Sequence, residues 1–279
     1  MISSLLAGPS SKYATGFQTW RLRPQESAGL NLHPDKTQIL HNGIGYGSGA
    51  THAKCGTITV EVQNCQCSNM CLGRSLRLRH LHDEELGNRI AKAWAKFSVY
   101  RAELTDKNIP LKYRMRLFNA TITPTMLYGS GSWAMTTERR QRVRTTQRRM
   151  MRTILGRHWK PGEDYVDWIK AATEEAEQTM RKHNVPDWVT LQQRRMWQWA
   201  GKVARSNDGR WSHEVLFWSP GGKRIQGRPF TRWSDHIVAF LRQTFGQEVG
   251  ELDWLPLAAD EKLWTDLEDQ FCRFMAEPY

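Results

Sequence analysis

The sequence has no long apolar run and few cysteines. No apolar stretch approaches the ~18 residues that a membrane-spanning helix needs, and residues 1–9 are too short and uncharged for a secretory signal. Its five cysteines are an odd number, which favours a reducing compartment with free thiols or a metal site over a disulfide framework. We therefore expect an intracellular protein, nuclear or cytoplasmic, with no membrane partner.

Acidic residues are scarce over most of the chain. Its 279 residues carry 40 Lys and Arg against 28 Asp and Glu, a net charge of +12. Residues 247–279 hold nine of the acids and two of the bases, so residues 1–246 have 38 bases, 19 acids and a net charge of +19. A body this basic indicates a polyanionic partner, most often nucleic acid, although charge that serves solubility alone is the other interpretation.

Hydrophobic residues make up 39% of the chain, and their spacing changes along it. Residues 57–62 alternate and are β-branched, which predicts a strand, and residues 71–76 could form another. From residue 82 apolar residues recur every three or four positions, which predicts helices. These helices are expected over residues 82–104, 110–124, 137–155, 164–182, 186–203, 230–245 and 260–275. The sequence thus predicts a mainly α protein with a small β region at the N-terminal side.

Three stretches of the sequence resemble the reverse transcriptases of non-LTR (LINE-like) retrotransposons. Residues 29–40, GLNLHPDKTQIL, are similar to the segment after the catalytic aspartates of the palm. Residues 71–73, CLG, stand where the family has the YLG of its primer-grip hairpin, with Cys in place of Tyr. Several helical stretches resemble the thumb of the family and the region beyond it. They are residues 88–90, 112–118, 124–129, 147–152 and 227–233. The resemblance covers roughly residues 27–240, and the ordered series is more specific than any of its pieces.

The resemblance implies a partial palm hairpin followed by a thumb-like helical bundle. It divides the chain into a degenerate N-terminus with a residual palm segment (1–80), a thumb-like helical region (81–160), a basic helical region (161–246) and an acidic helical tail (247–279). The chain resembles the C-terminal third or so of such an enzyme, with an altered stretch of about 25 residues at its start.

The family's polymerase centre needs metal-binding aspartates, including a paired YADD or FADD motif, which hold Mg²⁺ for phosphoryl transfer. In this sequence no Asp precedes Asp35, and the Asp-Asp dipeptide does not occur. We therefore predict no catalytic residues, no metal site and no cofactor in this chain, although Mg²⁺ serves the intact family. DNA synthesis by this chain alone is not expected.

Holding a template–primer duplex is the work that a thumb-like region could still perform. Thumbs bind the phosphate backbone, and Arg suits this contact because its planar guanidinium stays charged. Seven arginines fall within 14 residues that contain no acid: Arg139, Arg140, Arg142, Arg144, Arg148, Arg149 and Arg152. We predict that they contact the backbone of RNA or of an RNA/DNA duplex. A solvated helix face, or pairing with the acidic tail, is the alternative.

Further basic residues extend the predicted interface. One group is Lys112, Arg114 and Arg116, with Tyr113 for stacking. Another group interleaves bases with aromatic residues and consists of Arg194, Arg195, Trp197, Trp199, Lys202 and Arg205. Some of its aromatic residues are expected to belong to the core. A Gly-rich basic loop and the residues after it add Lys223, Arg224, Arg228 and Arg232. In the family, the lysine that matches Lys36 lies near the incoming nucleotide, but without the aspartates a turn lysine is the favoured interpretation.

Four of the cysteines fall within 17 residues: Cys55, Cys65, Cys67 and Cys71. Structural zinc sites favour C-x2–4-C pairs set apart by a loop, and only Cys67 and Cys71 fit that spacing, so zinc is not the favoured interpretation. Three functions remain open. The chain is a nucleic-acid-binding remnant, a polymerase whose palm is supplied by another chain, or a helical scaffold that pairs with other proteins through its Trp-rich surface, or a remnant without a role. The sequence sets no oligomeric state.

Overall fold

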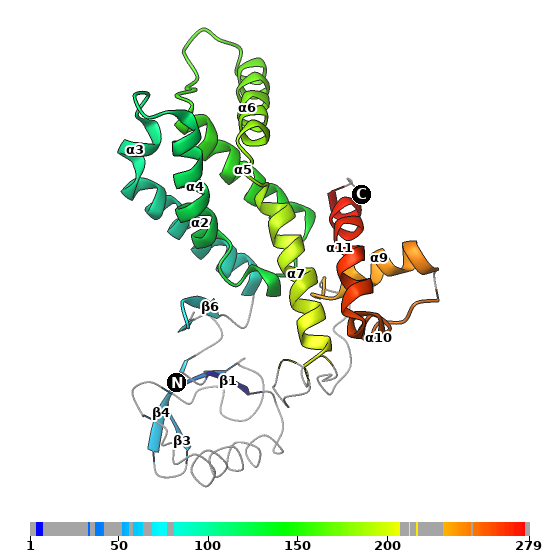
Figure 1. The fold of residues 1–279 in the computed structure, drawn as a ribbon. Coiled ribbons are helices and arrows are strands. Elements are labelled where there is room, and N and C mark those ends of the chain that lie inside the picture. Colours follow the sequence, from blue (N-terminus) through cyan, green and yellow to red (C-terminus); the bar gives the residue numbers. More distant parts are fainter. Residues whose placement is uncertain are drawn as a thin grey trace. The chain divides into compact units, whose positions relative to one another are not determined.

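The structure is a computed structural model of the chain, and Figure 1 shows its elements in sequence colours. It describes residues 4–7, 33, 37–41, 52–55, 58–63, 69–76, 81–206, 212, 216, 231–246 and 248–276. The chain forms two compact units, residues 1–88 and 89–279. The boundary falls within helix α2 (Leu81–Val99).

The first unit contains a small sheet. Its strands are β1 (Ser4–Ala7), β2 (Gln38–His41), β3 (His52–Cys55) and β4 (Ile58–Gln63), in the order β1-β2-β4-β3. β2 runs parallel to both of its neighbours, and β3 pairs with β4 antiparallel. The strand predicted over residues 57–62 is confirmed as β4. The other three have four residues each, which is too short for an alternating pattern to stand out.

A tight hairpin follows the sheet. β5 (Asn69–Cys71) pairs antiparallel with β6 (Arg74–Leu76). The two residues between them, Leu72 and Gly73, both have positive φ, at 49° and 79°. Positive φ at both central positions is the backbone of a type I′ turn, whose twist matches that of a two-stranded hairpin. A hairpin therefore stands at residues 71–73, where the resemblance implied one.

Polar contacts fix the hairpin to the first turns of α2. The carboxylate of Glu85 is buried and accepts a hydrogen bond from the Ser75 amide at 2.6 Å. The Nε atom of Arg74 lies 3.7 Å from the other carboxylate oxygen, so the buried charge has a cation beside it. Because a buried carboxylate is costly unless it is bonded, Glu85 ties the hairpin to the helix.

The second unit is helical. After α2 come α3 (Arg101–Thr105), α4 (Leu111–Met126), the 3-10 turn η2 (Ser130–Ser132), α5 (Thr137–Ile154), α6 (Tyr165–Lys182), α7 (Trp188–Ala204), α9 (Asp235–Phe245), α10 (Trp254–Ala259) and α11 (Glu261–Ala276). The mainly α fold with a small β region is confirmed. The single helix predicted over residues 82–104 is two helices, which meet at Tyr100. The six-residue α10 was not predicted, because it is too short for a helical period.

Side-chain caps begin three of the longer helices. The Thr136 hydroxyl accepts a hydrogen bond from the backbone amide three residues on, at the start of α5. Asp164 caps α6 and Asp187 caps α7, each through the amides two and three residues on. A cap of this kind contributes about 1 kcal/mol. The Pro186-Asp187 signal thus begins a helix as expected.

Helix α7 joins two groups of helices in the second unit (Figure 1). Near its start, Trp188 stacks on Phe118 of α4, and its indole N–H donates to the Thr123 hydroxyl at 2.9 Å. Further along, Trp197 stacks on Trp264 of α11, with ring centroids 3.7 Å apart. Each of these two indole N–H groups donates to the main-chain oxygen of the other residue. Several of the tryptophan side chains in this chain are therefore packed in the core.

Candidate nucleic-acid interface

Charge divides the second unit into two segments. Residues 89–160, here the cationic segment, contain 17 Lys and Arg but three Asp and Glu, a net charge of +14. Residues 161–279, here the C-terminal segment, contain 15 Lys and Arg and 19 Asp and Glu, a net charge of −4. On net charge alone, the first segment is the more favourable one for a polyanion. The position of each basic side chain within the cationic segment therefore decides where a phosphate could bind.

The structure gives several of the seven arginines of α5 partners inside the protein. Arg140 is buried and donates to the carbonyl of Met275 at 2.9 Å. Arg139 donates to a main-chain carbonyl at 2.8 Å, and Arg152 donates to the Thr173 hydroxyl at 3.0 Å. Burial lowers the pKa of Arg152, but a guanidinium remains charged at neutral pH. These arginines connect helices, and Arg140 has little surface to offer a phosphate.

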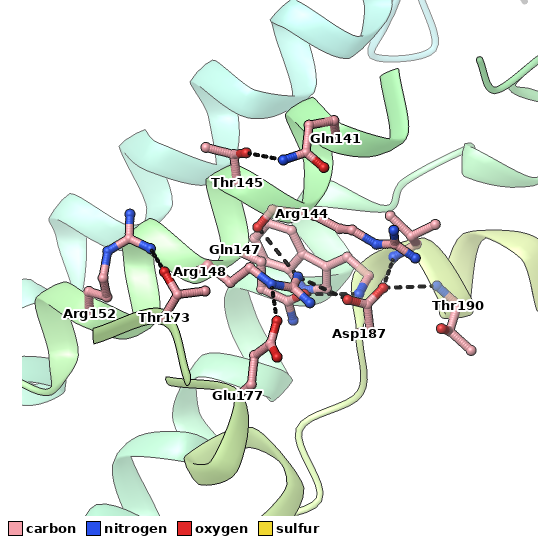
Figure 2. A network of polar contacts seen from close by, with 12 residues as sticks. Gln141, Arg144, Thr145, Gln147, Arg148, Arg152, Thr173, Glu177, Asp187 and Thr190 are labelled. Atoms are coloured by element: carbon pink, nitrogen blue, oxygen red, sulfur yellow. Dashed lines mark hydrogen bonds and ion pairs between the residues drawn. The ribbon is translucent and has the colours of Figure 1, made fainter. Parts of the chain in front are cut away.

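Arg148 joins α5 to the two helices that follow it, as Figure 2 shows. Its Nε atom donates to Glu177 of α6 at 2.8 Å, and its Nη1 atom donates to Asp187 at 3.0 Å. Asp187 also caps α7, so one carboxylate serves both contacts. One alternative to phosphate binding is that the arginines of α5 pair with acids of the tail. Arg148 does pair with acids, but these belong to α6 and to the N-cap of α7 and not to the tail.

The remaining arginines of α5 are closer to solvent. Arg149 is exposed, and its guanidinium lies over the ring of Trp94 in α2, 5.6 Å from the centroid. Arg142 and Arg144 are half-buried. Fewer arginines of α5 are therefore available to a phosphate than its sequence indicates.

In α4 the three basic candidates separate into one internal residue and two surface residues. Arg114 is buried and donates to the main-chain carbonyls of Leu104, Ile109 and Ile154. These three carbonyls end or connect neighbouring helices, which leave their last carbonyls without partners. Arg114 therefore holds α3, α4 and α5 together.

Lys112, Tyr113 and Arg116 are exposed on α4, and Tyr113 is 58% exposed. The helix contains no Asp or Glu. In the part of the chain that the structure describes, neither Lys112 nor Arg116 has a hydrogen bond or an ion pair. Because they are four residues apart, they lie on one face of the helix. This face, here the α4 face, has two available cations and an aromatic ring beside them.

The bases of α7 are also divided by the structure. Arg194 pairs with Glu268 and Asp269 of α11, and although burial opposes it, the hydrogen bond to Asp269 raises the pKa of Arg194. Arg205 donates to the Ala258 carbonyl at 2.8 Å. Arg195 donates to the carbonyl of Leu127. Lys202 is exposed on the same helix.

Of the other candidates, Arg232 is exposed and forms an ion pair with Glu251 at 2.6 Å. The residues that lie outside the described ones are Lys36, Lys223, Arg224 and Arg228. Two members of the cysteine cluster, Cys65 and Cys67, also lie outside them. Within the described ranges, no three His, Cys, Asp or Glu side chains gather as a metal site would require. Cys71 and Cys272 are free thiols among the described residues. Burial raises the pKa of Cys272 to about 11, so it stays protonated at neutral pH.

The structure also contains an exposed aromatic cluster that the sequence analysis did not identify. Trp159 is 44% exposed, and its ring centroid lies 6.4 Å from that of Tyr165, which in turn lies 5.7 Å from that of Trp168. The Trp159 indole donates to the Glu163 carbonyl at 3.0 Å, which fixes the ring. The sequence signal that could have indicated this cluster is the presence of three aromatic residues within ten positions around a Pro-Gly break. Three acids share the stretch, Glu163, Asp164 and Asp167, and they disfavour a polyanion here.

None of the helices in the described part of the chain combines the length and the apolar composition that crossing a bilayer requires.

No protein-family model matches the chain, and no solved structure gives a significant match. A protein of Caenorhabditis elegans that is named as transposon-derived is 26% identical over 245 residues, which are 85% of this chain and 81% of that protein. This similarity supports an origin of the chain in a transposable element.

Proposed function

We propose that this protein is a nucleic-acid-binding part of a non-LTR (LINE-like) retrotransposon reverse transcriptase that has no polymerase centre of its own. The ordered motifs between residues 27 and 240 support the enzyme family, and the transposon-derived relative supports the element type. The observation that carries the binding function is the α4 face, an exposed, acid-free pair of cations within a segment of net charge +14.

The α4 face suits a phosphate backbone. Lys112 and Arg116 are one helical turn apart and point the same way, so they can reach neighbouring phosphates of one strand. Tyr113 adds a hydroxyl that can also bond a phosphate oxygen. Such contacts fix where a duplex lies but read no bases, so the binding tolerates any sequence. Arg149 and Arg144 of α5 extend the cationic surface of the same segment.

A chain of this kind carries out no polymerase chemistry of its own. Two-metal phosphoryl transfer needs carboxylates that converge on Mg²⁺, and the paired aspartates of the family do not occur in the sequence. Primer extension by the purified protein with Mg²⁺ or Mn²⁺ is expected to give no product. Incorporation of nucleotides by this chain alone would contradict this part of the proposal.

The binding function is tested by measuring the affinity for an RNA/DNA hybrid by fluorescence anisotropy at several salt concentrations. Phosphate contacts release counterions, so the logarithm of the binding constant should fall linearly with the logarithm of the salt concentration. About six phosphate contacts correspond to a slope near −5. An affinity that does not depend on salt, or the lack of any binding at low salt, would contradict the proposal.

A further inference from the structure

A second surface of the second unit combines exposed aromatic rings with cations. Trp199 of α7 is 40% exposed, and it stands between Arg195 and Lys202 on one face of the helix. The turn that follows α4 carries Tyr128, which is 48% exposed. Neither α7 nor residues 107–137 contain an Asp or Glu. These two elements contribute no acid of their own, although Glu268 of α11 bonds Arg194 and Gln198 of α7.

The turn is fixed against α7. Arg195 donates to the Leu127 carbonyl, and Gln192 donates to the Ser130 carbonyl at 3.2 Å. Gly131 packs so closely that an added Cβ would lie 3.0 Å from the main-chain oxygen of Arg195 and 3.3 Å from the Cβ of Trp199. The segment that carries Tyr128 and the helix that carries Trp199 are therefore held together on a rigid frame.

Each ring has a cation close to it. The guanidinium of Arg89 lies over the ring of Tyr128, 4.8 Å from the centroid. Arg195 uses part of its guanidinium on the Leu127 carbonyl, and a guanidinium has five N–H donors, so others remain. Lys202 has no hydrogen bond or ion pair to any residue that the structure describes. The surface therefore offers flat apolar faces for stacking and positive charge for an anion, side by side.

We propose that Tyr128 and Trp199 form a stacking site for the unpaired bases of a single-stranded nucleic acid, with Arg195 and Lys202 beside its phosphates. Aromatic rings interleaved with cations are the combination that binds single strands without sequence preference, because every base has a flat face. The proposal rests on the proposed function and adds a ligand class to it. A duplex is gripped by its backbone, whereas a single strand exposes bases that these rings can stack on.

The charge of the surroundings favours a nucleic acid over a protein segment at this site. The Trp159 cluster is equally exposed, but residues 157–168 hold three acids against two bases, so a strand of phosphates is less favoured there. The two tryptophans therefore form a matched pair. Trp199 and Trp159 have similar exposure, but Trp199 stands between two cations on its helix, whereas the stretch around Trp159 holds more acids than bases. The proposal therefore assigns binding to the first and not to the second.

The test compares Trp199→Ala with Trp159→Ala, using an unstructured RNA of roughly 15 nucleotides, a length within the range that single-strand sites cover. Loss of one stacked base corresponds to a loss of affinity of about 5- to 100-fold for Trp199→Ala. Trp199→Phe should restore most of the affinity, because it returns an aromatic face. Trp159→Ala should leave the affinity unchanged within about twofold, as expected for a residue outside the site.

Ala at position 199 keeps the Cβ that packs against Gly131, so the turn stays in place. Should the variant nonetheless unfold, the wild-type protein decides the question. An RNA that contains 4-thiouridine, bound and irradiated, should crosslink to peptides that contain Tyr128 or Trp199. Crosslinks confined to other peptides, or equal losses of affinity in Trp199→Ala and Trp159→Ala, would overturn the proposal. Binding of an RNA/DNA hybrid without binding of single strands would overturn it too and leave the proposed function standing, whereas no binding of either would overturn both.

Discussion

The cationic segment and the C-terminal segment of the second unit are both built from amphipathic helices, but they use charge differently. The first has a net charge of +14 and the second −4. Acids of the second segment neutralise selected arginines of the first: Glu177 and Asp187 bond Arg148, and Glu175 bonds Arg157. The fold therefore decides which cations face acids and which face water, and Lys112 and Arg116 of α4 are among those that face water.

Helices α4 and α5 illustrate this within the cationic segment. α5 has seven arginines in an acid-free run, yet Arg140, Arg148 and Arg152 all bond groups that lie beyond Ile154 in the chain. α4 has fewer bases, but Lys112 and Arg116 are exposed and have no partner among the described residues. A high density of charge in the sequence is thus a poor guide to available charge, since a buried cation must be bonded within the protein.

The largest expected effect comes from breaking the contact between the two segments at Trp188. The side chain is fully buried, stacks on Phe118 and donates to Thr123. Trp188→Ala should lower the free energy of unfolding by about 3–5 kcal/mol, because it leaves a cavity and an unpaired hydroxyl. Denaturant unfolding measures the change, with the exposed Trp159→Ala as a control that should cost much less. Equal losses in the two variants would contradict the packing described here.

A smaller loss is expected at Arg148, where charge joins the segments. Arg148→Ala removes two charged hydrogen bonds and should lower the free energy of unfolding by about 1–3 kcal/mol, reduced by the part of the site that reaches solvent. Arg144→Ala is the control on the same helix and should change stability by less than about 0.5 kcal/mol. A comparable loss in both variants would show that helix propensity, and not the link to Glu177 and Asp187, accounts for the effect.

The smallest effect is a pH dependence at His236, which meets the main-chain carbonyl of Met135 across the same boundary. Burial lowers the pKa of His236 below its usual 6.5, and the nearby Arg140 also lowers it. Below pH 6.5 the unfolded chain therefore binds a proton more readily than the folded one, so stability falls as the pH decreases. The thermal midpoint should drop more between pH 7.5 and 5.5 for the wild type than for His236→Gln. The same drop in both would assign the pH dependence to other groups.

Helix positions could be predicted from the sequence, because apolar periods and local caps such as Asp187 are written in neighbouring residues. The roles of individual arginines could not. Arg140 bonds a carbonyl 135 residues away and Arg114 one 40 residues away, and no local pattern encodes such contacts. The interface predicted on α5 stays a prediction, and the internal partners of Arg140, Arg148 and Arg152 could not be foreseen. The packing of the turn that carries Tyr128 against α7 could not be foreseen either, because Arg195 and Trp199 are distant from it in the sequence.

The division of the chain at residues 80, 160 and 246 remains a prediction. The hairpin at residues 71–73 was implied by the resemblance, and the structure has a type I′ turn there. The sheet around it was mostly not foreseen, because short parallel strands pair with segments far away in the chain. Sequence reasoning thus located the elements that carry local signals and missed those that depend on distant partners.

The proposed function requires that available cations on the α4 face, and not net charge, bind nucleic acid. The most direct measurement compares Lys112→Glu/Arg116→Glu with Lys182→Glu/Lys262→Glu, which lowers the net charge equally at exposed lysines of the C-terminal segment. The affinity for an RNA/DNA hybrid should fall about tenfold or more in the first variant, with a salt dependence flatter by about 2, and change little in the second. Equal losses in the two variants would contradict the account.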